Sequence, residues 1–325
     1  MNMIRSLLVS ASLPRPLQDR AHNPINGGDA ESFAMAKLVL ACRGEGQWSS
    51  REEDSSKIDL IFSCEHPWYP GERLFVLTQV KSGSTYGEVT EKGFRLKENA
   101  KKAARRTSHG ICVVWVDRDA NRTWWAYVHP DVSSGPQEYG LYHEVSPATV
   151  YDLARCMSVR RQGATGAKGI IVRRRTSSLT ARRKRVRDIY RGFKRVKSPI
   201  LGEVELTRTG WRHMLRGGRL KENKAASLDL IPHLGRLLLR WPSSQAITAS
   251  QHFQRNGYWY RRCEHLLKYN NLTVSDASTE TSGNQVAYIR LIEEVRYPDD
   301  WESKVMRSQL VERRVVLKSA YFKPE

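Results

Sequence analysis

The chain has 325 residues, of which 40% are hydrophobic, and it carries a formal net charge of +20. This length favours about two domains over a single core, and the charge indicates a polyanionic partner such as a nucleic acid. No apolar run approaches the roughly 20 residues that a membrane-spanning helix needs, so a membrane partner is not expected.

Cysteine usage points to a reducing compartment. The five cysteines are scattered and form no CxxC pair, which fits neither a zinc site nor a disulfide framework. A cytoplasmic location is therefore expected. The apolar stretch Ile4–Leu13 is short and no clear cleavage site follows it, so a signal peptide is not expected.

Residues 1–157 are predicted to form an α/β domain. Gly110–Val116 is a continuous apolar run, which is typical of a buried central strand. Phe33, Ala34, Leu38 and Ala41 share one face of a predicted helix. In chain order, the expected elements are a helix over Asp29–Cys42, strands over Ile58–Phe62 and Leu74–Lys81, a helix over Glu98–Thr107, strands over Gly110–Val116 and Trp124–Val128, and a helix over Ala148–Met157.

A candidate metal-dependent site lies in this first region. Gln79 and Lys81 are two residues apart on a predicted strand and so share a face, and Asp59 belongs to the strand before it. Asp59, Glu31 and the Gln79 amide oxygen are the kind of oxygen ligands that Mg²⁺ takes. Lys81 is the candidate residue to orient or deprotonate the attacking water. As a plain structural alternative, Gln79 and Lys81 form a solvated strand end.

The set Glu31, Asp59 and Gln79-Val80-Lys81 resembles the PD-(D/E)XK nuclease superfamily in its Gln-x-Lys, Mrr-like branch. The resemblance covers roughly residues 26–157 and implies a mixed central sheet, Mg²⁺ as cofactor and DNA cleavage. Gln79 stands where the commoner pattern has an acid, which lowers the charge complementarity to a metal. The resemblance therefore also allows a domain that binds or senses without cutting.

Residues 158–198 form a strongly basic stretch. It contains fifteen Lys and Arg against one acid, Asp188, so its net charge is +14. The stretch shows little core pattern, apart from a basic helix expected over Thr180–Val196, and is predicted to be a linker or nucleic-acid-binding arm. Its cations would neutralise phosphates without reading sequence, and Tyr190 and Phe193 would stack on bases. The alternative is that this basic stretch is only a solvated charged segment without a binding function.

Residues 199–325 are predicted to form an α+β domain, in which two helices precede an antiparallel sheet. A strand over Leu201–Leu206 leads into a helix over Thr209–Leu215, and a second helix follows over Ser227–Trp241. Later strands are expected over Gly257–Arg262, Leu272–Ser275, Gln285–Glu293 and Leu310–Tyr321.

Candidate residues for RNA cleavage lie at both ends of this region. His213 titrates near neutrality and suits proton transfer, while Arg216 and Arg219 follow it and can grip a phosphate. Ser319 and Tyr321 share one face of the last strand and can hold the phosphate or pass a proton. RNA supplies its own nucleophile, the 2′-hydroxyl, so no metal is needed. Reserve candidates are Glu222, His252 and His265.

The order of these segments is similar to the ribonuclease superfamily of barnase, EndoU, colicin tRNases and RelE toxins. The resemblance runs from Thr207 through His213 to Lys318-Ser319-Ala320-Tyr321. It implies a toxin-like or antiphage-defence ribonuclease, with tRNA as a candidate substrate. It also allows a phage-derived trigger, an inhibitory protein or a homodimer.

The sequence therefore leaves three hypotheses for the function. The first is a metal-independent ribonuclease in the C-terminal region, with the N-terminal region sensing or regulating. The second is a metal-dependent DNA endonuclease of restriction type. The third is a non-catalytic regulator that binds nucleic acid.

Overall fold

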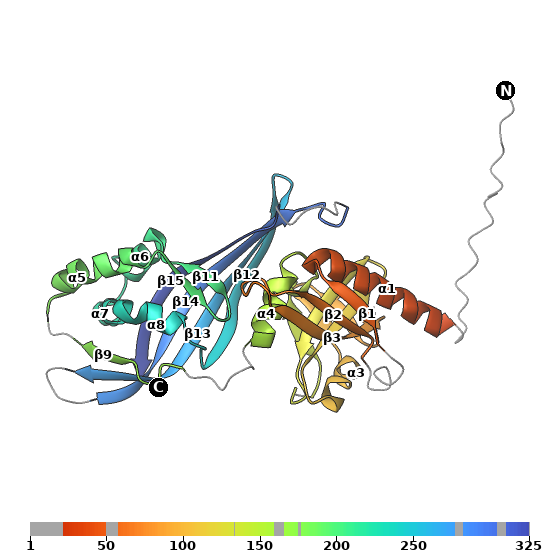
Figure 1. Cartoon of the computed structure of the whole chain (residues 1–325), viewed down its shortest axis with the longest axis horizontal. Coiled ribbons are helices and arrows are strands. Elements are labelled where there is room, and N and C mark those ends of the chain that lie inside the picture. The colour runs from red at the N-terminus through yellow and green to blue at the C-terminus, as the bar shows by residue number, and fades with distance from the viewer. Residues whose placement is uncertain are drawn as a thin grey trace, which may run out of the picture.

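The computed structural model describes residues 22–49, 58–132, 134–158, 166–174, 177–276, 282–303 and 310–324. In these ranges the chain is a mixed α/β structure with three sheets and short helices (Figure 1). This confirms the α/β character that the sequence predicted. Ile4–Leu13, Arg160, Arg161 and Arg175 lie outside the described residues.

The N-terminal half contains a five-stranded mixed sheet in the order β1-β2-β3-β6-β7. Only β3 and β6 run parallel, and the other neighbours are antiparallel. The strands are β1 (Glu45–Trp48), β2 (Leu60–Glu65), β3 (Arg73–Ser82), β6 (Ile111–Asp117) and β7 (Arg122–Val128). The predicted strands over 58–62, 74–81, 110–116 and 124–128 are therefore confirmed, with small shifts at their ends.

Both faces of this sheet are covered. Ala34 and Leu38 of α1 (His22–Cys42) and Leu153 of α4 (Thr149–Ser158) pack on one face. The other face carries a small sheet of β4 (Gly87–Thr90), β5 (Gly93–Leu96) and β8 (Gln137–Gly140). Burial on both faces explains why β6 is apolar up to its last residue, Asp117, which is partly exposed. The helix predicted over 98–107 is instead α3 (Glu98–Lys101) followed by a single 3₁₀ turn.

The C-terminal half is built on a seven-stranded sheet with long strands. The order is β10-β11-β15-β14-β13-β12, and β9 pairs in parallel with β13. The strands are β9 (Ile171–Arg174), β10 (Arg195–Ser198), β11 (Gly202–Glu205), β12 (Ser244–Arg255), β13 (Tyr258–Asp276), β14 (Ser282–Pro298) and β15 (Glu312–Pro324). Two of the predicted strands, over 257–262 and 272–275, are thus the two ends of β13.

Helices cover one side of this sheet. These are α5 (Leu179–Gly192), α6 (Arg208–Met214), α7 (Lys221–Leu230) and α8 (Leu234–Leu238). They bury a common core against β13, β14 and β15. The single helix predicted over 227–241 is instead α7, a 3₁₀ turn that contains Pro232, and α8. Proline lacks the backbone N–H of a helix interior, which accounts for the break.

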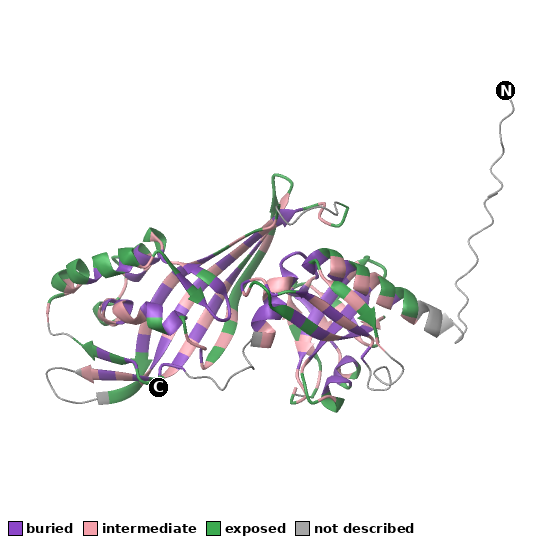
Figure 2. Ribbon diagram, viewed as in Figure 1, coloured by how far each residue is buried: buried purple, intermediate pink, exposed green. Residues whose placement is uncertain are grey.

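The basic stretch differs from the predicted linker in its described part. Its two ends form strands β9 and β10 of the large sheet, and α5 lies between them. Val172, Val186 and Tyr190 are buried in the C-terminal core. Tyr190 donates its hydroxyl to the Thr207 carbonyl at 2.8 Å, and Phe193 packs against the same core. Both aromatic rings therefore pack against the C-terminal core. Figure 2 shows that buried and exposed positions are mixed along α5.

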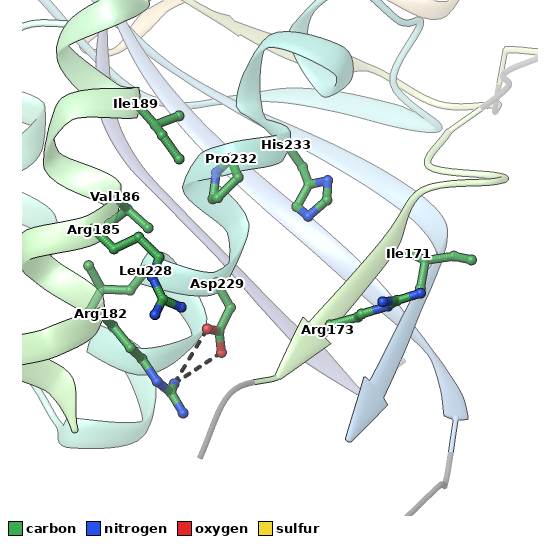
Figure 3. A pocket seen from close by; sticks show the side chains of 10 residues that line it. All are labelled: Ile171, Arg173, Arg182, Arg185, Val186, Ile189, Leu228, Asp229, Pro232 and His233. Carbon is green, nitrogen blue, oxygen red and sulfur yellow. Dashed lines mark hydrogen bonds and ion pairs between the residues drawn. The ribbon is translucent and has the colours of Figure 1, made fainter. Parts of the chain in front are cut away.

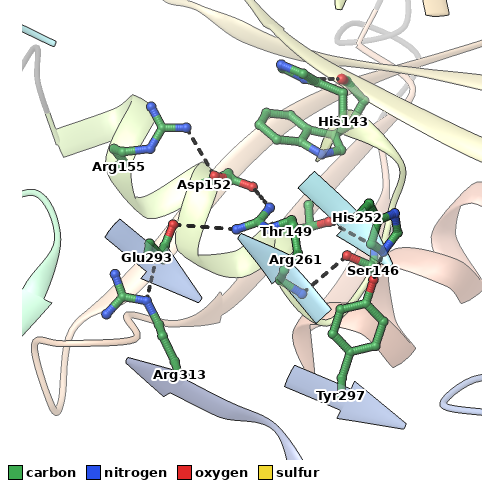
Figure 4. A network of polar contacts seen from close by, with 12 residues as sticks. His143, Ser146, Thr149, Asp152, Arg155, His252, Arg261, Glu293, Tyr297 and Arg313 are labelled. Carbon is green, nitrogen blue, oxygen red and sulfur yellow. Dashed lines mark hydrogen bonds and ion pairs between the residues drawn. The ribbon is translucent and has the colours of Figure 1, made fainter. Parts of the chain in front are cut away.

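A buried polar network joins the two halves (Figure 4). Asp152 of α4 accepts hydrogen bonds from Arg155 and from Arg261 of β13. Arg261 also lies 3.7 Å from Glu293 of β14, which accepts from Arg313 of β15 at 2.6 Å. Burial alone would raise the pKa of Glu293, but Arg313, His265 and Arg261 outweigh it and hold that pKa well below its usual range. The halves are thus connected by compensated charges.

No helix in the described ranges is long and apolar enough to cross a membrane.

Candidate functional site

His213 lies in the last turn of α6, where that helix meets β15. Gly210 sets this approach, because a Cβ at that position would lie 2.3 Å from the Leu317 carbonyl oxygen. Ser227 of α7 donates to the Ala320 carbonyl and fixes the next helix to the same strand. The α6–α7 turn is thereby held against β15, with His213 and Arg219 beside Lys318 and Tyr321.

The imidazole of His213 is surrounded by positive charge. Burial lowers its pKa, and the charges of Arg216, Lys318 and Arg219 lower it further. Glu264 of β13 acts in the opposite direction and raises the pKa. The Nδ1 atom is buried and has no hydrogen-bond partner among the described residues. The lowered pKa favours the neutral imidazole at neutral pH, and the side chain as a whole is partly exposed although its Nδ1 atom is enclosed by the protein.

Arg219 and Tyr321 lie together on the other side of the α6–α7 turn. The guanidinium group of Arg219 lies 5.6 Å from the centre of the Tyr321 ring. Arg219 also donates to the Met214 carbonyl at 3.0 Å and to Ser227 at 3.2 Å, which fixes its orientation. The Tyr321 ring stacks on Tyr288 of β14 at 5.4 Å. Arg219 and Tyr321 therefore offer an oriented guanidinium group and a tyrosine hydroxyl, which are groups suited to bind a phosphate.

Strand pairing adds residues that the sequence did not reveal. Glu264 accepts hydrogen bonds from Lys318 and, at 3.0 Å, from Arg290. Burial raises the pKa of Glu264, but these two cations outweigh it and lower the pKa below its usual range. Neither Glu264 nor Arg290 stands in a recognisable motif. The pairing of β13, β14 and β15 brings these two residues together near His213. In the sequence, the available signal was that each of them alternates with core residues along its strand.

The C-terminal candidates are thus linked in part: Arg219 lies over Tyr321, and the charge of Arg219 acts on His213. We define the His213 cluster as His213, Arg216, Arg219, Lys318 and Tyr321, with Glu264 beside it. Ser319 pairs with Arg290 in the sheet and shares the Tyr321 face, but it is only 3% exposed. The reserve histidines lie elsewhere, since His265 bonds Glu293 and His252 bonds Tyr297.

The N-terminal candidates are assembled in part. Asp59 accepts the Val80 N–H at 2.6 Å, and Lys81 lies 3.5 Å from the same carboxylate. Glu31 and Lys81 both line a cavity of about 560 Å³ between α1 and the end of β3. Gln79 is 1% exposed and is not among the residues that line this cavity.

The predicted Mg²⁺ donors are only partly placed around one cavity. One Asp59 oxygen accepts a backbone N–H and faces an ammonium group, and Gln79 does not line the cavity that contains Glu31. In the described ranges no group of three or more His, Cys, Asp and Glu side chains is arranged to hold a metal. A Mg²⁺ site that includes the Gln79 amide oxygen stays a prediction.

Two further cavities flank α5. The first, of about 360 Å³, has an apolar floor and a basic rim that includes Arg173, Arg185 and His233 (Figure 3). Within it Arg182 pairs with Asp229 at 3.2 Å. The second, of about 590 Å³, lies between α5 and α6 and is lined by five arginines.

Comparisons with protein-family models, curated proteins and solved structures gave no match.

Proposed function

We propose that this chain is a metal-independent endoribonuclease whose active site is the His213 cluster. The single observation that supports the proposal is the partly exposed His213 imidazole, whose pKa is lowered by burial and by the charges of Arg216, Lys318 and Arg219. A base beside several cations is the arrangement that RNA transesterification requires.

The proposed reaction uses only groups of the RNA and the protein. His213 takes the proton from the 2′-hydroxyl, whose oxygen attacks the adjacent phosphorus. The bond from phosphorus to the 5′-oxygen breaks, and the Tyr321 hydroxyl gives that oxygen a proton. The products are a 2′,3′-cyclic phosphate and a 5′-hydroxyl, and His213 returns its proton to Tyr321 through solvent. Arg219, Arg216 and Lys318 stabilise the charge on the phosphate.

Within this proposal the chain has two domains with a border near residue 158. The C-terminal domain cuts RNA, with tRNA as the candidate substrate and a role in defence or toxicity. The N-terminal domain senses or regulates. Its buried connection to β13, β14 and β15 offers a physical route, because Asp152 contacts Arg261 directly.

The test is RNA cleavage by purified variants with a chelator present. We expect His213→Ala to lose at least a hundredfold in rate, which is the scale of general acid–base catalysis. His233→Ala is the matched control, because His233 is also partly buried, its pKa is also lowered and it lies on the same helical layer. Equal loss in both variants, or full activity of His213→Ala, would contradict the proposal.

The alternative DNA endonuclease remains a prediction. It predicts Mg²⁺-dependent cleavage of plasmid DNA that is lost in Asp59→Ala and Lys81→Ala and retained in His213→Ala. The non-catalytic alternative predicts binding without cleavage of either nucleic acid. The same set of variants therefore separates all three functions.

A further inference from the structure

The cavity between α5 and α6 is lined by arginines from two helices. Arg183, Arg187 and Arg191 are four residues apart on α5, so they form a row along one side of that helix with a rise of about 6 Å between neighbours. Arg208 and Arg212 are also four residues apart, on α6. We call the space between the two rows the arginine groove.

The floor of the arginine groove is formed by core residues. Tyr190, Leu206 and Trp211 complete its lining. The Tyr190 and Trp211 rings lie 5.2 Å apart, and both side chains are largely buried. The groove thus combines buried aromatic and aliphatic side chains with five guanidinium groups in its lining.

The positive charge of the groove is not compensated within the described ranges. No acidic residue lines the groove. Arg187 makes one weak, exposed pair with Asp188 at 3.8 Å, and the other four arginines have no ion pair with any described residue. By contrast, Arg182 on the opposite side of α5 is paired with Asp229. Five like charges held on two fixed helices repel each other, and a bound polyanion would relieve that repulsion.

The groove and the His213 cluster are neighbours along the chain. Arg212 lines the groove and directly precedes His213 near the end of α6. Arg216 lies beyond the end of that helix, and its charge acts on the imidazole. A chain of phosphates that lies in the groove would present its next phosphodiester to His213.

We propose that the arginine groove binds the phosphate backbone of the RNA substrate on one side of the cleaved bond, without reading base sequence. This inference rests on the proposed function for the identity of the polyanion. Phosphate contacts by arginine carry affinity and register but no sequence information, so RNAs of different sequence should share this contribution.

The experiment measures binding of a fluorescein-labelled single-stranded RNA in which every 2′-hydroxyl is methylated, so that it cannot be cleaved. The groove variant is Arg183→Gln, Arg187→Gln and Arg208→Gln. Its slope of log affinity against log salt should be shallower by about 2, at about 0.7 for each lost phosphate contact. The slope should change equally for RNAs of unrelated sequence.

The matched control removes the same charge from exposed positions that do not line the groove. It is Arg173→Gln on β9 together with Lys184→Gln and Arg185→Gln on α5. Its slope should change by less than half as much. An unchanged slope in the groove variant, or an equal change in the control, would overturn the proposal.

The outcomes also separate this inference from the proposed function. If cleavage depends on His213 and the groove variant keeps the wild-type slope, the groove inference fails alone. If the groove variant loses its phosphate contacts and His213→Ala still cleaves, the proposed function fails and the groove stands as a polyanion site.

Discussion

At the scale of single residues, the charges around His213 set the pH range of the proposed reaction. The catalytic form of a base is the deprotonated one. Burial and the neighbouring cations lower the pKa of His213, so the deprotonated form persists to a lower pH than for an ordinary histidine. The acid limb of the pH–rate profile should therefore lie below the usual histidine pKa of about 6.5.

Arg216→Gln tests this cause. Removing the largest single charge that acts on His213 should raise the pKa of the imidazole and shift the acid limb to higher pH. The measurement is the single-turnover rate of RNA cleavage against pH. Arg262→Gln is the control, because Arg262 is an exposed arginine paired with Glu294. An acid limb that stays in place in Arg216→Gln would show that this charge does not act on the catalytic base.

These contacts explain how much of the site the sequence could predict. His213, Arg219 and Tyr321 were predicted from order and residue type, and the structure places Arg219 over Tyr321 and within electrostatic reach of His213. Glu264 was missed, and Lys318 was named only as part of the segment that ends in Tyr321. Their meeting depends on the register of strands far apart in the chain, including a bulge between Arg290 and Leu291. The alternation of apolar and polar residues along one strand does not determine the register between that strand and its neighbours.

At the scale of elements, the packing of α5 is the main departure from the sequence prediction, which expected a basic helix here but placed it in a linker. The many charged residues of α5 make its short apolar stripe hard to recognise in the sequence. The stripe consists of Val186 and Tyr190, which are four residues apart and both buried. Ile170 and Val172 likewise belong to the core although basic residues surround them. A stretch with a net charge of +14 can therefore be an integral layer of the fold when a few positions are apolar.

We predict that Tyr190→Ala destabilises the protein by about 3–5 kcal/mol, the range for removing a buried aromatic side chain. Tyr190→Phe should cost about 1 kcal/mol, because it removes only the hydrogen bond to the Thr207 carbonyl. The measurement is urea unfolding. Ile189→Ala is the control on the same helix, since Ile189 is 39% exposed. Equal small effects in all three variants would mean that α5 is a detached linker.

At the scale of the whole molecule, the buried network makes the two halves depend on each other. Asp152 is fully buried and compensates Arg261, which is 2% exposed. Removing one partner of a buried pair leaves an uncompensated charge. Neither residue stands in a pattern that would predict the contact, because it forms between segments more than a hundred positions apart.

Asp152→Ala should lower the free energy of unfolding by about 3–5 kcal/mol. Adding Arg261→Leu should recover part of that loss, because the orphaned guanidinium is removed as well. Glu294→Ala is the control, because it breaks the exposed pair with the neighbouring Arg262 and should cost at most about 1 kcal/mol. If Asp152→Ala and Glu294→Ala cost the same, the network does not hold the halves together.

The central claim is the metal-independent chemistry of the His213 cluster, and the ends of cleaved RNA test it most directly. The measurement is mass spectrometry of the fragments that the wild-type protein produces from RNA with excess chelator. We predict 2′,3′-cyclic phosphates paired with 5′-hydroxyl ends, and no such fragments from His213→Ala. Fragments with 3′-hydroxyl ends that form only when Mg²⁺ is added would contradict the account.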